Sequence, residues 1–567
     1  MKKLSLLFII ISVNTVASGY EVDSTMVQQL GGLCRVWGFL KYYHPQIQEG
    51  KVDWDSELLL IVPKILAVSN NEDYNKIINQ LIQSAGSIKK LSRPYQYLPK
   101  DTSYNNFDYS WISDKKLFTK ENSRMLWEVI ENYKPNDNVY FKKEFNTRVD
   151  ENKFRDNPNE NNYYPDTAHS LLALFRYWNV INYFYPYKKL MDENWNDVLI
   201  EFIPKTIENA GTGNFYLTIA ELVAELNDCH SFFDNYYFNH HVGPLKSLYD
   251  WRNVPLLVMF IENKTIITRV RKRVADQTNL KRSDIILAIN GTPIDEIRNE
   301  LRKYCGCSTS LSVEREISNG IFMSYFAPRE NNYSITISDS ANTIRTVTIS
   351  NETAKGAFVS LGVLDSITRL ISDSIGYINL SSMNRKDIRR AIKHFQNTSA
   401  LIFDLRDNSN ASLLPIGMRL PRRKGGVFAN YYACKFKYPG SFKFSKQKDM
   451  YLGLRTFHKK YKGNVIFLIN ENVQSTYEWQ LMSLQSDYRI TLIGNNTSGT
   501  DGASPSFLIQ NNILTFFSGD GVFYPDGKQV QRIGIKPDIC AVQTIKGIRE
   551  GRDDVLDRAV KFIQTGK

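Results

Sequence analysis

The chain carries an internal repeat, and this repeat constrains the fold of its N-terminal half. Residues 37–45 (WGFLKYYHP) recur as residues 178–186 (WNVINYFYP), and Trp54 recurs as Trp195 with the same offset of 141 residues. In each copy, apolar residues at helical spacing precede an aromatic–Pro break, and a second helix begins near the tryptophan. We therefore expect two helical hairpins, in residues 18–88 and 167–248. Their aromatic side chains are expected to form core.

The rest of the chain changes pattern twice. Residues 89–166 are rich in Asn, Lys, Tyr and Asp without a sustained period, which favours an irregular connecting region with a few short strands. Residues 249–351 contain short β-rich runs, and residues 352–567 alternate apolar strands with helical segments. A length of 567 residues allows three or four domains. The predicted fold class is therefore multidomain α/β, with the duplicated hairpins at its N-terminal end.

The N-terminus has the features of an export signal. Lys2 and Lys3 are followed by an apolar run over residues 4–13 and by small residues at 15–17. This pattern predicts a secretory signal peptide over residues 1–17 and a periplasmic or extracellular protein, with an uncleaved membrane anchor as the alternative. No later segment approaches twenty uninterrupted apolar residues, so we expect no membrane span in the mature chain.

Charge and cysteine content argue against two other classes of protein. The 71 basic and 59 acidic residues give a net charge of +12, but only residues 269–273 and 422–424 are densely basic. Such a diffuse excess does not predict nucleic-acid binding. The six cysteines lack the paired spacing of a zinc site or a disulfide framework. We therefore predict no metal and no cofactor.

One string within the β-rich region suggests a peptide ligand. Residues 280–293 (LKRSDIILAINGTP) combine a polar turn, an apolar strand and an Asn-Gly turn suited to a tight hairpin. The string resembles the central segment of PDZ domains, so residues 249–351 are expected to form a PDZ-like domain. Such domains bind polypeptides by adding a strand to a sheet edge. Val254, Pro255 and Leu256 stand where the loop that binds the terminal carboxylate is expected.

A serine follows a buried strand in the C-terminal region. Residues 465–469 form an apolar run, and Ser475 comes at the start of the helix that follows. Backbone N–H groups and the positive end of the helix dipole at this position can stabilise an oxyanion. The alternative is that Ser475 only caps the helix.

Several motifs in order connect this serine with a known family. The segment is followed by residues 494–502 (GNNTSGTDG), 524–527 (YPDG) and 534–539 (GIKPDI). From about Val254 to the C-terminus the chain resembles the carboxyl-terminal processing peptidases, which include tail-specific proteases and tricorn-core-like serine peptidases. The resemblance implies a crotonase-like α/β peptidase core in residues 352–567, with Ser475 as the nucleophile.

The resemblance also suggests the base. Tail-specific members have a lysine about 25 residues after the serine, where this chain has Thr500. The tricorn-like branch instead uses a histidine from the N-terminal side, and residues 226–232 (LNDCHSF) resemble that motif. His230, at the end of the second helical repeat, is therefore the expected base, because a neutral imidazole can accept a serine proton. Taken alone, His230 is also compatible with an ordinary partly buried histidine.

The remaining site positions depart from the family pattern. The orienting acid corresponds to Gln531, whose amide can accept a hydrogen bond but cannot compensate an imidazolium charge. The resemblance implies backbone N–H groups of Thr476 and Asn410 as oxyanion donors.

We expect an exported serine endopeptidase that acts on polypeptides. The alternative is a degenerate homologue that only binds peptides, and an acyl-CoA enzyme is disfavoured. The sequence does not predict an oligomeric state.

Overall fold

The computed structural model describes most of the chain. It divides into two compact units, which are described separately below. The first unit runs to Leu222 and includes Lys435–Ser441 and Ser506–Leu514, and the second takes up the remainder. The described residues are 22–92, 104–136, 138–140, 165–235, 255–325, 332–350, 356–361, 366–407, 412–421, 426–435, 437–448, 459–510 and 513–566. The predicted signal peptide at residues 1–17 lies outside them.

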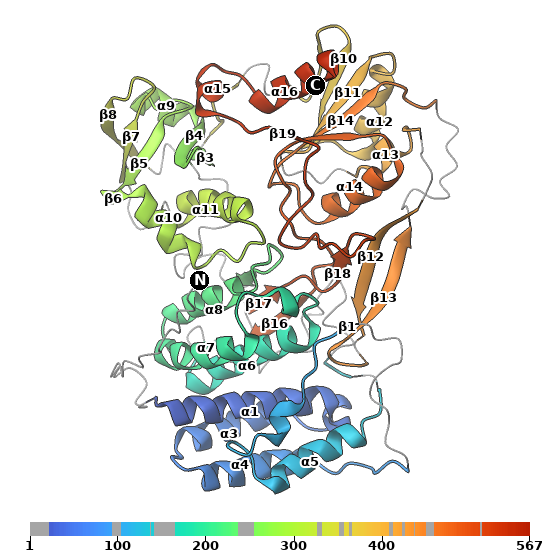
Figure 1. Ribbon diagram of the computed structural model, residues 1–567. Helices are drawn as coiled ribbons and strands as arrows, with labels where there is room; N and C mark the ends of the chain where they lie inside the picture. Colours follow the sequence, from blue (N-terminus) through green and yellow to red (C-terminus); the bar gives the residue numbers. More distant parts are fainter. Residues whose placement is uncertain are drawn as a thin grey trace, which may run out of the picture. The chain divides into compact units, whose positions relative to one another are not determined.

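The first unit is built mainly of helices (Figure 1). Both expected hairpins contain helices on either side of the aromatic–Pro break. In chain order the α-helices are α1 (Ser24–Tyr43), α2 (Pro45–Gln48), α3 (Trp54–Leu66), α4 (Asn71–Ser84), α5 (Lys120–Glu131), α6 (Thr167–Phe184), α7 (Trp195–Asn209) and α8 (Asn214–Ala224). Helix α5 corrects the expectation that residues 89–166 are irregular. Its N-cap Thr119 and its buried Leu126 and Val129 give it the cap and the apolar face of an ordinary amphipathic helix.

Each copy of the repeat contains the same pair of internal hydrogen bonds between its two tryptophans. In the first copy the Nε1–H groups of Trp37 and Trp54 each donate to the backbone carbonyl of the other, both at 2.9 Å. In the second copy Trp178 and Trp195 do the same, at 2.6 and 2.9 Å. These indoles are nearly inaccessible to solvent, so their N–H groups need internal acceptors. The aromatic residues of the repeat therefore serve as core, as expected.

Helices α1 and α6 pack tightly at Gly38 and Asn179, which are equivalent positions of the repeat. A Cβ added to Gly38 would lie 1.9 Å from Asn179 Oδ1, while the Asn179 amide donates to the carbonyl of Cys34 at 3.1 Å. We expect Gly38→Ala to lower the free energy of unfolding by about 1–3 kcal/mol, because the helices must separate. Denaturant unfolding measures this. Gly426→Ala, where a Cβ meets no neighbour, is the control. Equal stability of the two variants would contradict this close packing.

The second unit begins with a β-rich module. Five antiparallel strands pair in the order β3-β4-β5-β7-β8, and β6 pairs with β5. Asn290 and Gly291 both have positive φ and join Ile289 to its partner Thr292, so the predicted tight Asn-Gly turn is confirmed. The elements are β3 (Leu256–Ile261), β4 (Lys264–Val270), α9 (Lys272–Thr278), β5 (Ile285–Ile289), β6 (Thr292–Pro293), α10 (Ile294–Arg302), α11 (Ser310–Tyr325), β7 (Asn332–Ser338) and β8 (Ile344–Ser350).

A six-stranded sheet of order β19-β15-β14-β11-β10-β9 follows in the same unit. Its pairs are parallel except that of β9 with β10. This confirms the predicted alternation of buried strands and helices. Its elements are β9 (Thr368–Ile371), β10 (Ile375–Asn379), α12 (Arg385–His394), β11 (Ala400–Asp404), α13 (Leu414–Gly417), β14 (Asn464–Ile469), α14 (Thr476–Asp487), β15 (Thr491–Gly494), β19 (Ile539–Cys540), α15 (Ile545–Arg549) and α16 (Asp554–Thr565).

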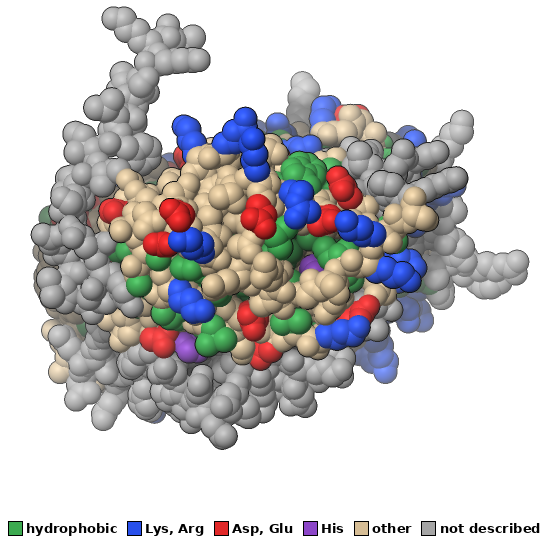
Figure 2. Space-filling model, turned by 90° about the horizontal axis from the view of Figure 1, so that it is seen from below, with side chains coloured by type: hydrophobic (Ala, Val, Ile, Leu, Met, Phe, Trp, Pro, Cys, Tyr) green, Lys and Arg blue, Asp and Glu red, His purple; other side chains and the backbone are tan. Residues whose placement is uncertain are grey.

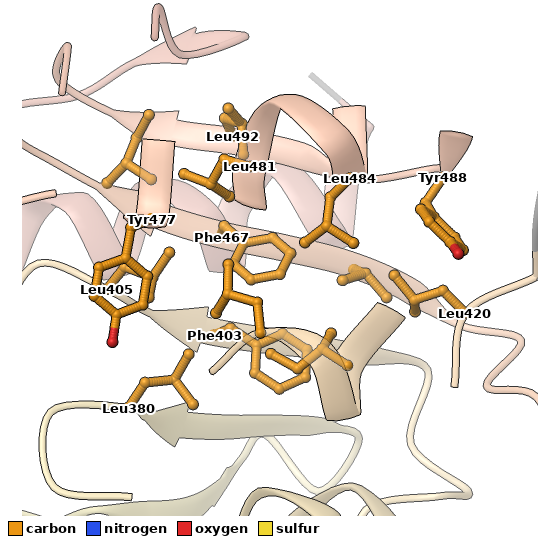
Figure 3. Close-up of a cluster of buried hydrophobic side chains, with 14 of the residues drawn as sticks. Leu380, Phe403, Leu405, Leu420, Phe467, Tyr477, Leu481, Leu484, Tyr488 and Leu492 are labelled. Carbon is orange, nitrogen blue, oxygen red and sulfur yellow. The ribbon is translucent and has the colours of Figure 1, made fainter. Parts of the chain in front are cut away.

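The sheet is buried on both faces. Helices α12 and α14 share one apolar cluster with the strands, and α16 shares another. Figure 3 shows Tyr477, Leu481 and Leu484 of α14 lying near Phe467 of β14. Tyr477 follows Thr476, the candidate oxyanion donor. Its bulky side chain packs in the core and anchors the start of α14. Beside this sheet, β12 (Val427–Cys434) pairs with both β13 (Ser441–Lys448) and β18 (Gly521–Phe523).

Two findings concern the surface. On the face drawn in Figure 2, basic and acidic side chains are interspersed rather than gathered into a basic band. Among the described helices, none is both long enough and apolar enough to cross a membrane.

Candidate active site

Ser475 occupies a strained turn between β14 and α14. Its backbone has φ 59° and ψ −119°, a left-handed conformation that is uncommon for serine. Ordinary N-cap residues are extended, so this geometry is not that of a plain cap. The Ser475 N–H donates to the Thr500 carbonyl at 2.8 Å and faces Glu478 Oε2 at 3.2 Å. These contacts fix a half-buried serine at the head of a helix.

The structure brings the His230 segment to the Ser475 segment. Gln474, directly before the serine, donates from Nε2 to the carbonyl of Cys229, directly before the histidine, at 3.4 Å. Thr500 bridges the two, because its carbonyl accepts the Ser475 N–H and its Oγ1 accepts the Cys229 N–H at 3.2 Å. In the described part of the chain no hydrogen bond joins the Ser475 hydroxyl to the imidazole itself. Catalytic hydrogen bonds are often long or poorly aligned without a ligand.

The hydrogen bonds of His230 define which ring nitrogen can act as a base. Nδ1 lies 2.9 Å from Ser518 Oγ, and the Ser518 hydroxyl donates to Asp228 Oδ1 at 3.0 Å. A serine hydroxyl has one proton, and here that proton is directed to the carboxylate. Ser518 Oγ must therefore accept the Nδ1–H, which leaves Nε2 unprotonated. This is the tautomer that a general base needs.

Asp228 organises this arrangement from a buried position. Its carboxylate also accepts the backbone N–H of Ser518 at 2.8 Å and of His230 at 3.0 Å. Burial lowers the pKa of His230, and the negative charges of Asp228 and Cys229 offset this only in part. The imidazole, which is 7% exposed, thus stays neutral at neutral pH.

Gln531 does not have the orienting contact that the family resemblance implies. Its side chain is fully buried, and neither amide atom has a hydrogen-bond partner among the described residues. The contact to Nδ1 comes from Ser518 instead. Sequence reasoning missed Ser518, because it lies 288 residues from His230 without a motif of its own. Asp228, two residues before the histidine, lies within the motif of residues 226–232.

The predicted oxyanion donors are only partly described. Thr476 is the first residue of α14 and is exposed, and within the described part its N–H has no hydrogen-bond acceptor, so it is free to donate. Asn410 lies outside the described residues. Of the predicted peptide-binding loop, Val254 also lies outside them, and Leu256 is fully buried in the core of the β-rich module. A peptide at this position would meet backbone rather than the Leu256 side chain.

A buried carboxylate that the sequence analysis did not single out supports the nucleophile turn. Glu478 is fully buried, and it accepts the N–H groups of Gly499 and Thr500 at 2.8 and 2.9 Å and the Thr497 hydroxyl at 2.5 Å. Burial raises its pKa to about 7, against the effect of these donors. The Ser-x-x-Glu spacing of a capping box was the available signal.

We expect Ser518→Ala to lower kcat by about a hundredfold or more with little change in KM, because His230 loses the contact that fixes its tautomer. Steady-state kinetics and the pH–rate profile measure this effect. Ser518→Thr keeps the hydroxyl and should recover most of the rate. A rate gain in Gln531→Glu, with Ser518→Ala unaffected, would assign the orienting role to position 531 instead.

Sequence comparison identifies the family of the core. Residues 374–541 match the sequence profile of peptidase family S41. Residues 374–541 are thus similar in sequence to the S41 peptidases. The match includes Ser475, Thr500 and Gln531, whereas Asp228 and His230 come from outside it. No curated protein sequence matches the chain.

The chain is also similar to several solved structures. The crystal structure of mature CPAF is 13% identical, with a TM-score of 0.54, and the match covers 70% of this chain and 97% of CPAF. The complex of mature CPAF with lactacystin is 14% identical, with a TM-score of 0.53 and coverages of 71% and 99%. The photosystem II D1 C-terminal processing protease is 14% identical, with a TM-score of 0.37 and coverages of 68% and 98%. The likeness to CPAF shows a shared fold.

Proposed function

We propose that this protein is an exported serine endopeptidase that hydrolyses polypeptides with Ser475 and His230. The observation that carries the proposal is the contact between the two segments. Gln474 and Thr500 hold the residues next to the serine and the histidine together, although these lie 245 positions apart. The S41 match supplies the class of reaction.

The reaction would follow serine acyl transfer. His230 Nε2 removes the proton from Ser475 Oγ as the oxygen attacks the peptide carbonyl carbon. The N–H group of Thr476 stabilises the oxyanion, and the family resemblance implies the N–H group of Asn410 as the second donor. The imidazolium then gives its proton to the leaving amine, and the C–N bond breaks. A water molecule, deprotonated by the same nitrogen, hydrolyses the acyl-enzyme.

Charge compensation differs here from a direct histidine–carboxylate pair. The developing imidazolium hydrogen-bonds Ser518, and the carboxylate of Asp228 lies behind that hydroxyl. The attraction between imidazolium and carboxylate thus acts through one intervening group. The Asp228 carboxylate supplies the negative charge that Gln531 lacks. It lies in a buried region, where charge interactions are strong.

The substrate class proposed is polypeptide, held by a PDZ-like module beside a crotonase-like core. Within the described sheet, β3 pairs with β4 on one side only, so its other edge can take an added strand. A cavity of about 960 Å³ lies beside α14, lined by Met482, Tyr524 and Ile533 together with Lys528 and Lys536. Its apolar walls with polar groups suit a peptide side chain.

A second candidate function is peptide binding without hydrolysis. The specific observation in its favour is Gln531, whose amide has no hydrogen-bond partner among the described residues and stands where the family pattern has an acid. The binder would keep the module and the scaffold while Ser475 remains unreactive.

A fluorophosphonate probe distinguishes the two candidates. We expect the full chain at pH 8 to be labelled on Ser475, and expect Ser475→Ala and His230→Ala to remain unlabelled. Mass spectrometry of the labelled peptide identifies the site. Absence of labelling in the wild type, together with retained binding of an extended peptide, would overturn the peptidase proposal in favour of the binder.

A further inference from the structure

Two cysteines meet directly beside the candidate base. Cys229 precedes His230 and is half-buried, and Cys307 is 7% exposed. The Cys307 side chain lies close enough to the Cys229 sulfur for the two thiols to influence each other's pKa. Ser308, the residue after Cys307, donates its N–H to Cys229 Sγ at 3.2 Å and accepts the Cys229 N–H on its Oγ at 3.2 Å. Both the backbone and the sulfur of Cys229 are therefore held against the Cys307 segment.

The surroundings of Cys229 favour its thiolate. Besides Cys307 and Ser308, the Ser498 hydroxyl donates to Sγ at 3.2 Å, and the positive charge of Arg315 lies nearby. Burial raises the pKa of the Cys229 thiol, but these donors and the Arg315 charge outweigh it and hold the pKa well below its usual value. Partial exposure, hydrogen-bond donors and a neighbouring second thiol are the features of a reactive cysteine.

We propose that Cys229 is a peroxide-reactive site and that its oxidation product is a disulfide with Cys307. In the first step the Cys229 thiolate attacks one oxygen of a hydroperoxide, the O–O bond breaks, and sulfenic acid and hydroxide form. In the second step Cys307 gives its proton to the hydroxide and attacks the sulfenic sulfur. The S–S bond forms and the sulfenic oxygen leaves as hydroxide, which becomes water by taking up the proton that the Cys229 thiol released when it ionised. Overall, two thiols and one hydrogen peroxide give one disulfide and two waters.

The location of this pair couples its oxidation to the active site. Cys229 is peptide-bonded to His230, and its carbonyl accepts the hydrogen bond from Gln474 that joins the two catalytic segments. A bond to Cys307 draws Sγ away from Ser498, whose backbone N–H is in turn bound to the carbonyl of Val473 in the nucleophile turn. We therefore expect oxidation to displace His230 and to lower catalysis. This consequence rests on the proposed function, whereas the thiol chemistry does not.

Peptide mapping of the full chain tests the thiol site. The protein is reduced, freed of reductant, exposed to hydrogen peroxide and digested without reduction. We expect a linked peptide containing Cys229 and Cys307. In Cys307→Ser the sulfenic acid on Cys229 has no partner, so dimedone should trap it there. Cys540→Ser, which removes an exposed cysteine on β19, should leave the linkage unchanged. A Cys305–Cys307 linkage, or no adduct on Cys229, would overturn the proposal.

Fluorophosphonate labelling tests the consequence for catalysis. We expect the oxidised chain to label at least tenfold more slowly than the reduced chain, and expect dithiothreitol to restore the rate. In Cys307→Ser, labelling after peroxide and then dithiothreitol should equal that of the untreated variant. Unchanged labelling of a chain shown to hold the disulfide would overturn the coupling alone. A reduced chain that is never labelled would count against the peptidase proposal, while the mapping result would stand by itself.

Discussion

Replacing His230 with alanine is expected to abolish peptide hydrolysis, with a loss in kcat of about 10⁴-fold or more. The reason is that Nε2 is the nitrogen left unprotonated by the Nδ1–H contact to Ser518. The fold should survive, because Ser518 and Asp228 remain bonded to each other through both the hydroxyl and the backbone N–H of Ser518. Hydrolysis rate and thermal unfolding, measured on the same preparation, separate the two effects.

The control for this variant is His394→Ala, an exposed histidine at the end of α12 that should leave the rate unchanged. The wild-type pH profile gives a further check. Because burial lowers the pKa of His230, the imidazole takes up a proton only below its ordinary value near 6.5. The acid limb of kcat/KM should therefore lie below pH 6.5. A His230→Ala chain that keeps a tenth of the wild-type rate would remove His230 from the mechanism.

Replacing Glu478 with alanine is expected to have the largest effect on stability. The carboxylate accepts three backbone N–H groups, including that of Ser475, and the Thr497 hydroxyl. The Ser475 N–H keeps the Thr500 carbonyl as an acceptor, but the Gly499 and Thr500 N–H groups and the Thr497 hydroxyl lose theirs, and in a fully buried site each costs about 1–3 kcal/mol. We expect a loss of several kcal/mol in the free energy of unfolding. Ser475 should also become much less reactive toward the fluorophosphonate probe, because its strained backbone loses support.

Glu478 should also make stability depend on pH. Its pKa is raised to about 7 in the folded chain, above the ordinary value of 4.5. Between these pH values the folded state keeps a proton that the unfolded state releases, so stability falls as the pH rises from about 4.5 to 7. The size of this contribution is about 3 kcal/mol. Glu478→Gln cannot titrate, and denaturant unfolding at pH 5 and pH 7.5 should show a smaller difference for it than for the wild type. Equal differences would contradict a buried, titrating Glu478.

Local features of the site were predictable from sequence. Ser475 could be found because an apolar strand, a short polar turn and a helix follow one another within about twenty residues. The Asn290-Gly291 hairpin could be found because a turn needing two positive φ values selects those residue types. His230 could be found only through its likeness to a family motif, because nothing else in the sequence set it apart from the other histidines. Gln531 was assigned by the same likeness, but its side-chain amide forms no hydrogen bond with the imidazole or with any other described residue.

The sequence by itself determined the helical repeat, the strands of the sheet and the place of Ser475 between a strand and a helix, because these depend on residue periodicity and on backbone preferences over short distances. Only the tertiary structure decided that Ser518 contacts His230, that Glu478 binds the loop at Gly499 and Thr500, and that Cys229 lies against the segment of Cys307 and Ser308. The physical reason is that a buried polar group must find a partner wherever the packing of distant segments places one, and that placement leaves no local pattern in the chain.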